Sequence, residues 1–163
     1  MTKSVVVGVP CKINLILDIV GRREDRYHLL RTIMQSVDLY DYVLITPGEY
    51  PGIFIESNRV QLSCDTTNTA YRAASIFFEE MGIEDHAIKI EIVKNIPMQA
   101  GLGGGSADAA AVLIGLNELY GTNCTLEDLA ALGLRVGADV PFCIYGGTML
   151  CEGVGEICTP LTP

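Results

Sequence analysis

The sequence predicts a two-layer α/β sandwich of the α+β type, with helices packed on a mostly antiparallel sheet. Residues 88–93 alternate strictly between apolar and polar side chains, which is the period of a strand with one buried face. Residues 68–81 carry apolar side chains at helical spacing, and residues 107–120 are apolar nearly all round, as in a buried helix. Strands precede and follow these helices in mixed order, and 163 residues suit one domain.

The first third of the chain is expected to contribute most of the strands. Val5–Val9 is an apolar strand that Pro10 is expected to end. The run that follows places Lys12, Asn14 and Asp18 at even spacing, so these polar side chains share one face of a strand. Either this face is exposed to solvent or it serves a site, and the pattern leaves both readings open. Further strands are expected at residues 30–37, 42–46 and 53–56.

Glycines and a capping residue mark the helix boundaries in the second half of the chain. Gly82 is expected to end the first helix and Gly121 the second. Thr125 is a suitable N-cap for a third helix, which is expected to end near Gly137. Two short strands are then expected at residues 147–151 and 155–161.

Composition narrows the class of partner. A formal net charge of −9 argues against a nucleic-acid backbone or an anionic membrane surface as partner. No run reaches the roughly 18 apolar residues of a transmembrane helix, and no signal peptide is visible, so we expect a cytoplasmic protein. A hydrophobic content of 49% is high, and predicts a surface that is normally covered, for instance by a second domain. The oligomeric state stays open.

The cysteines are expected to be reduced. There are six of them, none in a C-x-x-C pair, and only two histidines accompany them. Cysteines at scattered spacing are typical of a cytosolic protein that uses the residue as a small hydrophobe. We therefore expect neither a disulfide framework nor a zinc site.

A glycine-rich stretch before the second helix is the strongest functional signal. Gly101, Gly103, Gly104 and Gly105 occupy four of five consecutive positions, although glycine is the residue most costly to order. Bare backbone N–H groups followed by a helix N-terminus make a site for anions, most often phosphate. The stretch is therefore interpreted as a nucleotide-phosphate cradle, with a merely flexible surface loop as the alternative.

The spacing narrows the kind of cradle. The stretch lacks the Gly-Lys pair of a P-loop, and it misses the dinucleotide-binding fingerprint at Ser106, where a glycine would be needed. It matches P-x-x-x-G-L-G-x-x-[SA]-A, beginning at Pro97. This pattern resembles the phosphate loop of the GHMP kinases, the family that includes galactokinase, homoserine kinase and mevalonate kinase.

Four other segments also resemble motifs of this family, and they occur in the family's order along nearly the whole chain. They are residues 10–15 (Pro-Cys-Lys-Ile-Asn-Leu), Tyr27-His28, residues 137–141 (Gly-Ala-Asp-Val-Pro) and residues 152–156 (Glu-Gly-Val-Gly-Glu). The resemblance implies that residues 1–163 form the N-terminal ATP-binding domain, with a ribosomal protein S5 domain 2-like fold, and that the C-terminal GHMP domain is absent. Within the family, the set is most similar to kinases that phosphorylate the 2-hydroxyl of a cytidine diphosphate-linked methylerythritol in non-mevalonate isoprenoid biosynthesis.

The resemblance also implies roles for two charged residues. Asp139 matches the general base that accepts the proton of the substrate hydroxyl, and Lys12 matches the lysine that keeps this aspartate ionised and steadies the transferring phosphoryl group. Phosphoryl transfer depends mainly on positioning and charge neutralisation, so such a pair is physically reasonable. The alternatives are that Asp139 only caps a turn and that Lys12 is an ordinary strand lysine.

Further residues are assigned by the same resemblance. The expected cofactors are ATP and Mg²⁺, with Ser106 as a weak candidate for the metal because Gly104 and Gly105 stand where other family members have serines. Arg26 stands where the family usually has glycine, which puts the shape of the cytidine pocket in doubt. The residues expected at ATP are Asn68, Lys94, Pro97, Gly101, Leu102, Gly103, Gly104, Gly105 and Ser106, and those expected at the substrate are Asn14, Tyr27 and His28.

Three alternatives remain at this point. The chain could belong to another GHMP small-molecule kinase of the homoserine or mevalonate type. It could bind nucleotide without catalysis, for lack of the second domain. An RNA-binding module, suggested by the likeness of the family to a ribosomal-protein fold, is the weakest because of the negative charge.

Overall fold

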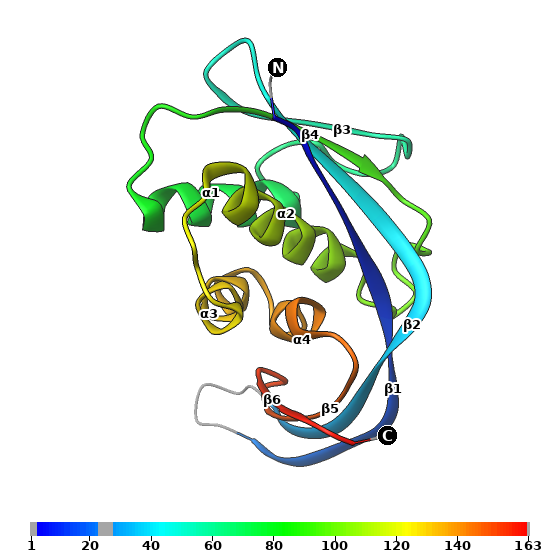
Figure 1. The fold of residues 1–163 in the computed structure, drawn as a ribbon. Coiled ribbons are helices and arrows are strands. Elements are labelled where there is room, and N and C mark those ends of the chain that lie inside the picture. Colours follow the sequence, from blue (N-terminus) through cyan, green and yellow to red (C-terminus); the bar gives the residue numbers. More distant parts are fainter. Residues whose placement is uncertain (1–2, 23–27, 163) are drawn as a thin grey trace.

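A computed structural model describes residues 3–22 and 28–162 and confirms the expected fold class, one sheet covered by helices. Figure 1 shows the helices gathered on the concave side of a curved sheet, which makes two layers. The strands are β1 (Val5–Arg22), β2 (His28–Pro47), β3 (Gly52–Ser57), β4 (Ala87–Val93), β5 (Thr148–Gly153) and β6 (Ile157–Pro160). The helices are α1 (Thr69–Met81), α2 (Gly104–Tyr120), α3 (Leu126–Val136) and α4 (Val140–Tyr145). Within the described residues, no helix is long and apolar enough to cross a membrane.

The long strand β2 organises the sheet. The strand order is β3-β4-β2-β5-β6, and β1 pairs with β2 as well. The C-terminal part of β2 pairs with β4 and its N-terminal part pairs with β5, while β1 follows almost its whole length. All these pairings are antiparallel except β3 with β4, as the mostly antiparallel prediction required.

The prediction that Pro10 ends a short strand was wrong. β1 runs through Pro10 to Arg22, with shifts of register between Pro10 and Cys11 and at two later points. Within the described part of the chain β1 pairs only with β2, and proline is tolerated at bulges and on edge strands because its missing N–H is not needed there. The separate strands predicted at 30–37 and 42–46 are likewise one strand, β2.

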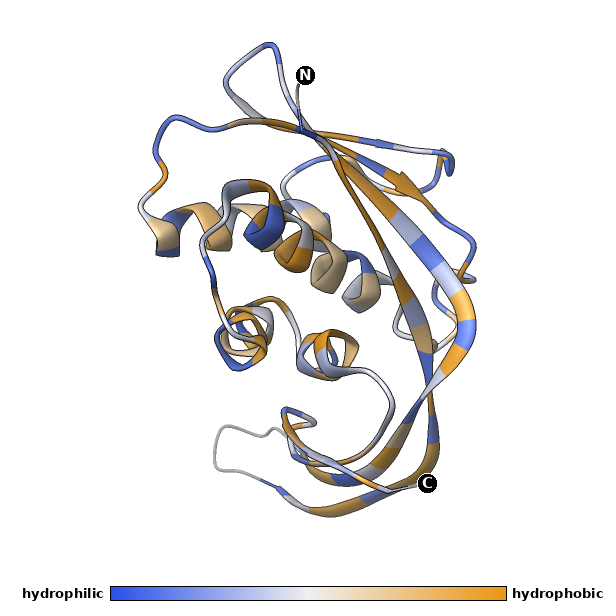
Figure 2. Cartoon of the chain, in the orientation of Figure 1, coloured by the Kyte–Doolittle hydropathy of each residue, from blue (hydrophilic) through white to orange (hydrophobic). Residues whose placement is uncertain are grey.

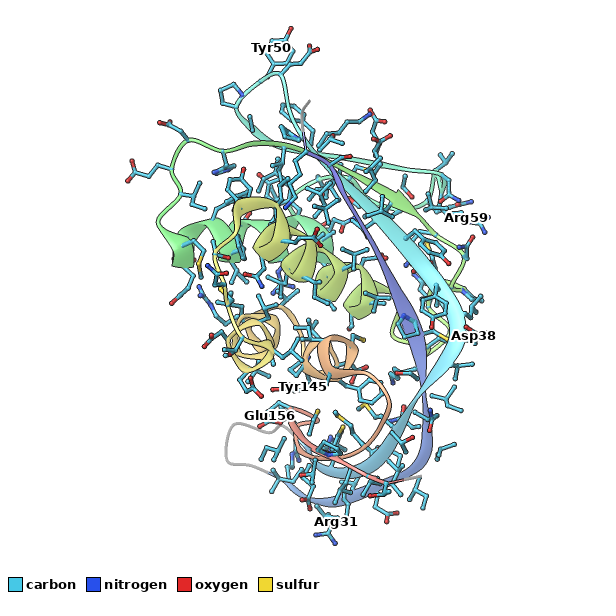
Figure 3. The ribbon with its side chains drawn as sticks, viewed as in Figure 1. Arg31, Asp38, Tyr50, Arg59, Tyr145 and Glu156 are labelled. Carbon is cyan, nitrogen blue, oxygen red and sulfur yellow. The ribbon has the colours of Figure 1, made fainter. Side chains whose placement is uncertain are left out.

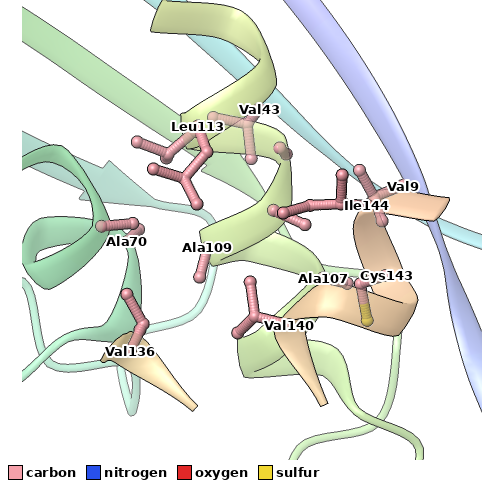
Figure 4. Packing of buried hydrophobic residues seen from close by; sticks show 14 of the residues in the cluster. Val9, Val43, Ala70, Ala107, Ala109, Leu113, Val136, Val140, Cys143 and Ile144 are labelled. Atoms are coloured by element: carbon pink, nitrogen blue, oxygen red, sulfur yellow. The ribbon is translucent and has the colours of Figure 1, made fainter. Parts of the chain in front are cut away.

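Helix α2 lies at the centre of the core, as its apolar sequence predicted. Nine of its residues are buried, and it contacts α1, α4, β1 and β2. In Figure 4, Leu113 of α2 lies near Val43 of β2, and Ala107 lies near Cys143 of α4. The helix begins at Gly104, earlier than the predicted start near Ala107, so the last glycines of the rich stretch form its first turn.

The expected signals mark the end of α1 and both ends of α3. Asn68 caps α1 and Gly82 ends it in a left-handed conformation, while Thr125 and Asp128 form a capping box at α3. Figure 2 shows both hydrophobic and hydrophilic residues on α3, as in a helix with one buried face. The short helix α4 was not predicted, because six residues are too few to show a helical period.

Candidate active site

The glycine loop, residues 97–105, borders a cavity of about 430 Å³ where α1 and α2 begin. Residues 97–106 line it, together with Gln61, Leu62, Thr69, Lys94 and Asp108. The Thr69 hydroxyl at the start of α1 donates a hydrogen bond of 2.7 Å to the carbonyl oxygen of Gly105 in the first turn of α2. The positive end of α2 therefore lies at the cavity, as an anion site requires.

Position 103 requires glycine for two reasons, its backbone conformation and the lack of room for a side chain. Its φ is +73°, in the left-handed region that favours glycine. A Cβ at this position would lie 3.0 Å from Cγ of Lys12. The backbone N–H of Lys12 also donates to the carbonyl oxygen of Leu102 over 3.0 Å. The glycine loop is thus held directly against β1 at the candidate catalytic lysine.

Lys12 and Asp139 form an ion pair although they lie far apart in the sequence. Nζ of Lys12 is 3.3 Å from Oδ2 of Asp139, and the side chains are 8% and 34% exposed, respectively. Asp139 occupies the N-cap position of α4, yet its side chain makes no capping hydrogen bond. The Asp139 carboxylate therefore pairs with Lys12 instead of capping the helix, and it remains accessible to solvent. The exposed-face reading of Lys12 was wrong, because the lysine is buried.

A row of polar side chains continues from this pair along the sheet. Nζ of Lys12 donates to Oδ1 of Asn14 over 2.8 Å, and Nδ2 of Asn14 donates to the hydroxyl of Thr32 over 2.7 Å. The Thr32 hydroxyl then donates to the carbonyl oxygen of Ile16 over 2.7 Å. Because Asn14 accepts from the ammonium, these bonds fix both the orientation of its amide and the position of Nζ. Sequence reasoning missed Thr32, since a threonine in a strand carries no distinguishing signal.

Lys94 lies in a different environment, between two buried carboxylates. Its Nζ contacts Oδ2 of Asp41 and lies 2.8 Å from Oδ2 of Asp108, and the three side chains are at most 2% exposed. The second oxygen of Asp108, Oδ1, has no hydrogen-bond partner within the part of the chain that the structure describes. Burial raises the pKa of Asp108 to about 7, with Lys94 acting in the opposite direction.

Asp41 joins this cluster to the glycine loop. Its Oδ1 accepts hydrogen bonds from the backbone N–H groups of Asn95, at 2.6 Å, and of Ile96, at 2.8 Å. Asp41 therefore ties the segment that enters the loop to β2. Sequence reasoning missed both carboxylates. A charged residue in the apolar run of α2 was the available signal for Asp108, whereas nothing marked Asp41.

The structure brings together most of the residues expected at ATP. Pro97, Leu102, Ser106, Lys94 and the four glycines all line the cavity. Asn68 does not: its side-chain oxygen Oδ1 accepts a hydrogen bond from the N–H of Ala70, and its side-chain Nδ2 donates to the backbone carbonyl oxygen of Ser63. Its expected contact with nucleotide stays a prediction.

The residues expected at the substrate lie mainly on the sheet. Asn14 is next to Lys12, and His28 is exposed at the start of β2. Tyr27 and Arg26 lie outside the described residues, so the cytidine pocket stays a prediction.

A protein cage for a metal ion is absent from the described ranges, 3–22 and 28–162, since no group of three or more His, Cys, Asp or Glu side chains could hold one there. Mg²⁺ commonly binds through one or two protein oxygens, with water and substrate phosphates as its other ligands. The Ser106 hydroxyl at the cavity and the half-exposed Asp139 carboxylate are oxygen donors of this kind. These donors fit a metal that arrives with a nucleotide.

Comparison with known proteins agrees with this geometry. Residues 68–147 match the model of the GHMP kinases N terminal domain. The chain is 55% identical over 152 residues to 4-diphosphocytidyl-2-C-methyl-D-erythritol kinase of Clostridium perfringens (strain 13 / Type A), covering 93% of this chain and 52% of that protein. It is 52% identical over 150 residues to the protein of the same name from Caldicellulosiruptor saccharolyticus, covering 92% and 51%.

Solved structures agree as well. A crystal structure of 4-(cytidine 5'-diphospho)-2C-methyl-D-erythritol kinase matches with a TM-score of 0.80 at 39% identity, covering 97% of this chain and 55% of that one. The mevalonate kinase of Methanococcus jannaschii shares the fold, with a TM-score of 0.80 at 16% identity over 99% of this chain and 56% of that one. The chain thus spans about half the length of the curated relatives it matches. With its glycine loop, its Lys12–Asp139 pair and these relatives, the chain belongs to the GHMP kinase family.

Proposed function

We propose that this chain is the nucleotide-binding and phosphoryl-transfer part of an ATP-dependent small-molecule kinase. The proposed substrate is 4-diphosphocytidyl-2-C-methyl-D-erythritol, phosphorylated on its 2-hydroxyl in non-mevalonate isoprenoid biosynthesis in the cytoplasm. The substrate comes from the names of the relatives. The observation that carries the chemistry is the Lys12–Asp139 pair, held against the glycine loop by the contact between Lys12 and Gly103.

The residues divide the work of phosphoryl transfer in a physically consistent way. The N-terminal N–H groups of α2 and the backbone of the glycine loop bind the negative phosphates. The Lys12 ammonium stabilises the negative charge on the transferring group, and its ion pair with Asp139, 3.3 Å long, holds the carboxylate beside that group. Asp139 accepts the proton of the substrate hydroxyl as the oxygen attacks.

Mg²⁺ would be held by the nucleotide phosphates, with the Ser106 hydroxyl as the protein ligand that we propose. When bound, the metal neutralises charge on the phosphates. The protein's own part is to orient these phosphates toward Lys12.

Replacement of Asp139 tests the assignment. In the chain as it stands, ADP release is measured with 4-diphosphocytidyl-2-C-methyl-D-erythritol, homoserine or mevalonate as the acceptor. Asp139→Asn should lower turnover about 10²- to 10⁴-fold, because the general base is lost, while Mg-ADP affinity stays within about threefold. Asp85→Asn is the matched control, since Asp85 is exposed and lies away from the cavity. Unchanged turnover in Asp139→Asn would refute the assignment.

Nucleotide binding is measured separately, by backbone amide NMR shifts of the glycine loop on titration with Mg-ADP. Saturable shifts at Gly101 and Gly103 without turnover would favour the alternative of a chain that binds nucleotide but does not catalyse. Turnover with homoserine or mevalonate alone would favour another kinase of the family. A well-dispersed spectrum with no shifts would contradict the proposed phosphate cradle.

A further inference from the structure

Two cysteines face each other across the hairpin of β5 and β6. Cys151 of β5 is the direct partner of Cys158 of β6 in the antiparallel register. The N–H of Leu161 donates to the carbonyl oxygen of Thr148, so the 148–161 pair is hydrogen-bonded. Because such pairs alternate with non-hydrogen-bonded ones, the 151–158 pair is of the non-hydrogen-bonded kind, in which Cα atoms are only about 4.5 Å apart. That separation lies within the range of natural disulfides, about 4.4–6.8 Å.

The two thiols are already in contact. Their Sγ atoms lie 3.3 Å apart, and one thiol donates a hydrogen bond to the other. Cys151 is fully buried, whereas Cys158 is partly exposed. One sulfur is therefore accessible to a reagent in solution, and the second lies directly behind it.

Their environments differ in a way that divides the two roles. The hydrogen bond from Cys151 lowers the pKa of the Cys158 thiol. The same bond, together with burial, raises the pKa of Cys151. Cys158 is thus the better nucleophile and Cys151 the proton-bearing partner.

The other cysteines lack this arrangement. All six cysteines are free thiols, and no other pair of cysteines is hydrogen-bonded among the residues that the structure describes. Cys143 is buried in the core, and burial raises its pKa to about 12. Burial likewise raises the pKa of Cys11, and Cys64 is exposed and donates to the carbonyl oxygen of Leu62. Only the 151–158 pair combines a thiol that solvent can reach with a second thiol close enough to form a disulfide with it.

The hairpin also adjoins the candidate active site. A Cβ on Gly155, in the turn of the hairpin, would lie 3.7 Å from the carbonyl oxygen of Ala138, the neighbour of Asp139. Figure 3 shows Glu156 of this turn and Tyr145 at the end of α4 on the same side of the sheet. A covalent bond in the hairpin would therefore stiffen the wall next to Asp139.

We propose that Cys151 and Cys158 are a redox-active dithiol that forms an intrachain disulfide on reaction with a small disulfide such as glutathione disulfide. The Cys158 thiolate attacks one sulfur of the oxidant and releases one glutathione thiolate, leaving a mixed disulfide on Cys158. Cys151 then loses its proton to solvent, and its sulfur attacks Sγ of Cys158 and displaces the second glutathione thiolate. Two protein thiols are oxidised and one glutathione disulfide is reduced to two thiols.

The test is a count of thiols and a peptide map of the native chain after treatment with glutathione disulfide. The expected result is loss of two of the six free thiols with an intact mass lower by two hydrogens, reversed by dithiothreitol. Cleavage after glutamate separates the two cysteines at Glu152 and Glu156, so the fragments stay joined only through a disulfide. A chain that keeps all six thiols, or that links through Cys64 between two copies, overturns the proposal.

Single variants assign the order of events, after circular dichroism has confirmed that each is folded. Cys151→Ser should stop at a stable mixed disulfide carrying one glutathionyl group. Cys158→Ser should react at neither position of the pair. Cys143→Ser is the matched control, because Cys143 lies nearby but outside the pair, and it should form the bridge like the unmodified chain. A bridge that disappears in Cys143→Ser would contradict the assignment to 151 and 158.

Discussion

Two buried lysines contact neighbouring glycines of the same loop, yet their partners differ. Lys12 adjoins Gly103 and pairs with one carboxylate, that of Asp139, which is 34% exposed. Lys94 adjoins Gly104 and is enclosed by two carboxylates that are at most 2% exposed. The Lys12 ammonium can exchange the Asp139 carboxylate for an incoming anion, because water and substrate can reach this ion pair. The positive charge of Lys94 is already neutralised, since the carboxylates of Asp41 and Asp108 lie on two sides of its ammonium.

The difference supports the chemical role that we propose for Lys12 and a structural role for Lys94. An ammonium that is to stabilise a transition state must be reachable by the substrate, and the 34% exposure of Asp139 leaves the Lys12–Asp139 pair accessible from solvent. A buried ion cluster instead fixes one arrangement of the backbone, here the entry into the glycine loop through Asp41. Although the sequence assigned both lysines to the site, their surroundings give them distinct tasks.

Among the substitutions that test this comparison of the two lysines, Lys12→Met should have the largest effect, a loss of activity. The methionine keeps most of the side-chain volume but removes the charge near the transferring phosphoryl group. Turnover should fall about 10²- to 10³-fold, as when one stabilising group for a developing charge is removed. Stability should change little, because Asp139 can be hydrated in the absence of its partner. Turnover and urea denaturation of the same preparation check both parts, and an unfolded Lys12→Met chain would contradict the proposed division of roles.

Lys94→Met should reverse this pattern. It leaves two carboxylates buried together without a cation, and breaking a buried ion pair from one side costs about 3–5 kcal/mol of unfolding free energy. Urea denaturation of the two lysine variants side by side gives the comparison. A Lys94→Met chain as stable as the Lys12→Met chain would show that the buried cluster does not hold the loop.

Asp108→Asn should change how stability depends on pH. Burial raises the pKa of Asp108 from 3.8 to about 7, so the folded state holds an extra proton between these values. The contribution of this group to stability is therefore fully present below pH 3.8 and is lost as the pH rises through about 7. The difference in unfolding free energy between the unmodified chain and Asp108→Asn should be more favourable to the unmodified chain at pH 5 than at pH 8. Urea denaturation at both values measures it, and a difference independent of pH would argue against a raised pKa.

Gly103→Ala should have a smaller effect that sharpens the contact between the loop and Lys12. Gly101 and Gly103 both have positive φ, but a Cβ on Gly101 would meet nothing within 4 Å. Both alanine variants should lose about 1–2 kcal/mol from the left-handed backbone. Gly103→Ala should additionally displace Lys12 and lower turnover several-fold more than Gly101→Ala. Equal turnover in the two variants would mean that the close approach of Gly103 has no part in placing the lysine.

The sequence predicted regular elements where the signal is local. The capping residue Thr125 and the terminating Gly82 act within one turn, so they could be identified without knowledge of the fold, whereas Asn68, expected at ATP, is the N-cap of α1. The predicted strand boundaries were less accurate, and Pro10 was wrongly expected to end a strand. Whether a proline ends a strand or lies in a bulge depends on the neighbouring strand, which the local sequence does not show.

What the sequence by itself determined is the class of site: four glycines before an apolar helix predict an anion cradle, because backbone N–H groups and a helix N-terminus act over a few residues. Only the tertiary structure decided which charges meet at that cradle. The family resemblance implied that Lys12 acts on Asp139, and the structure shows the ion pair; the enclosure of Lys94 and the contact of Cys151 with Cys158 appear in the structure alone, and all three join residues on different elements. The physical reason is that strand register, bulges and the packing of helices on the sheet set these distances, and none of them is encoded in the spacing of a single motif.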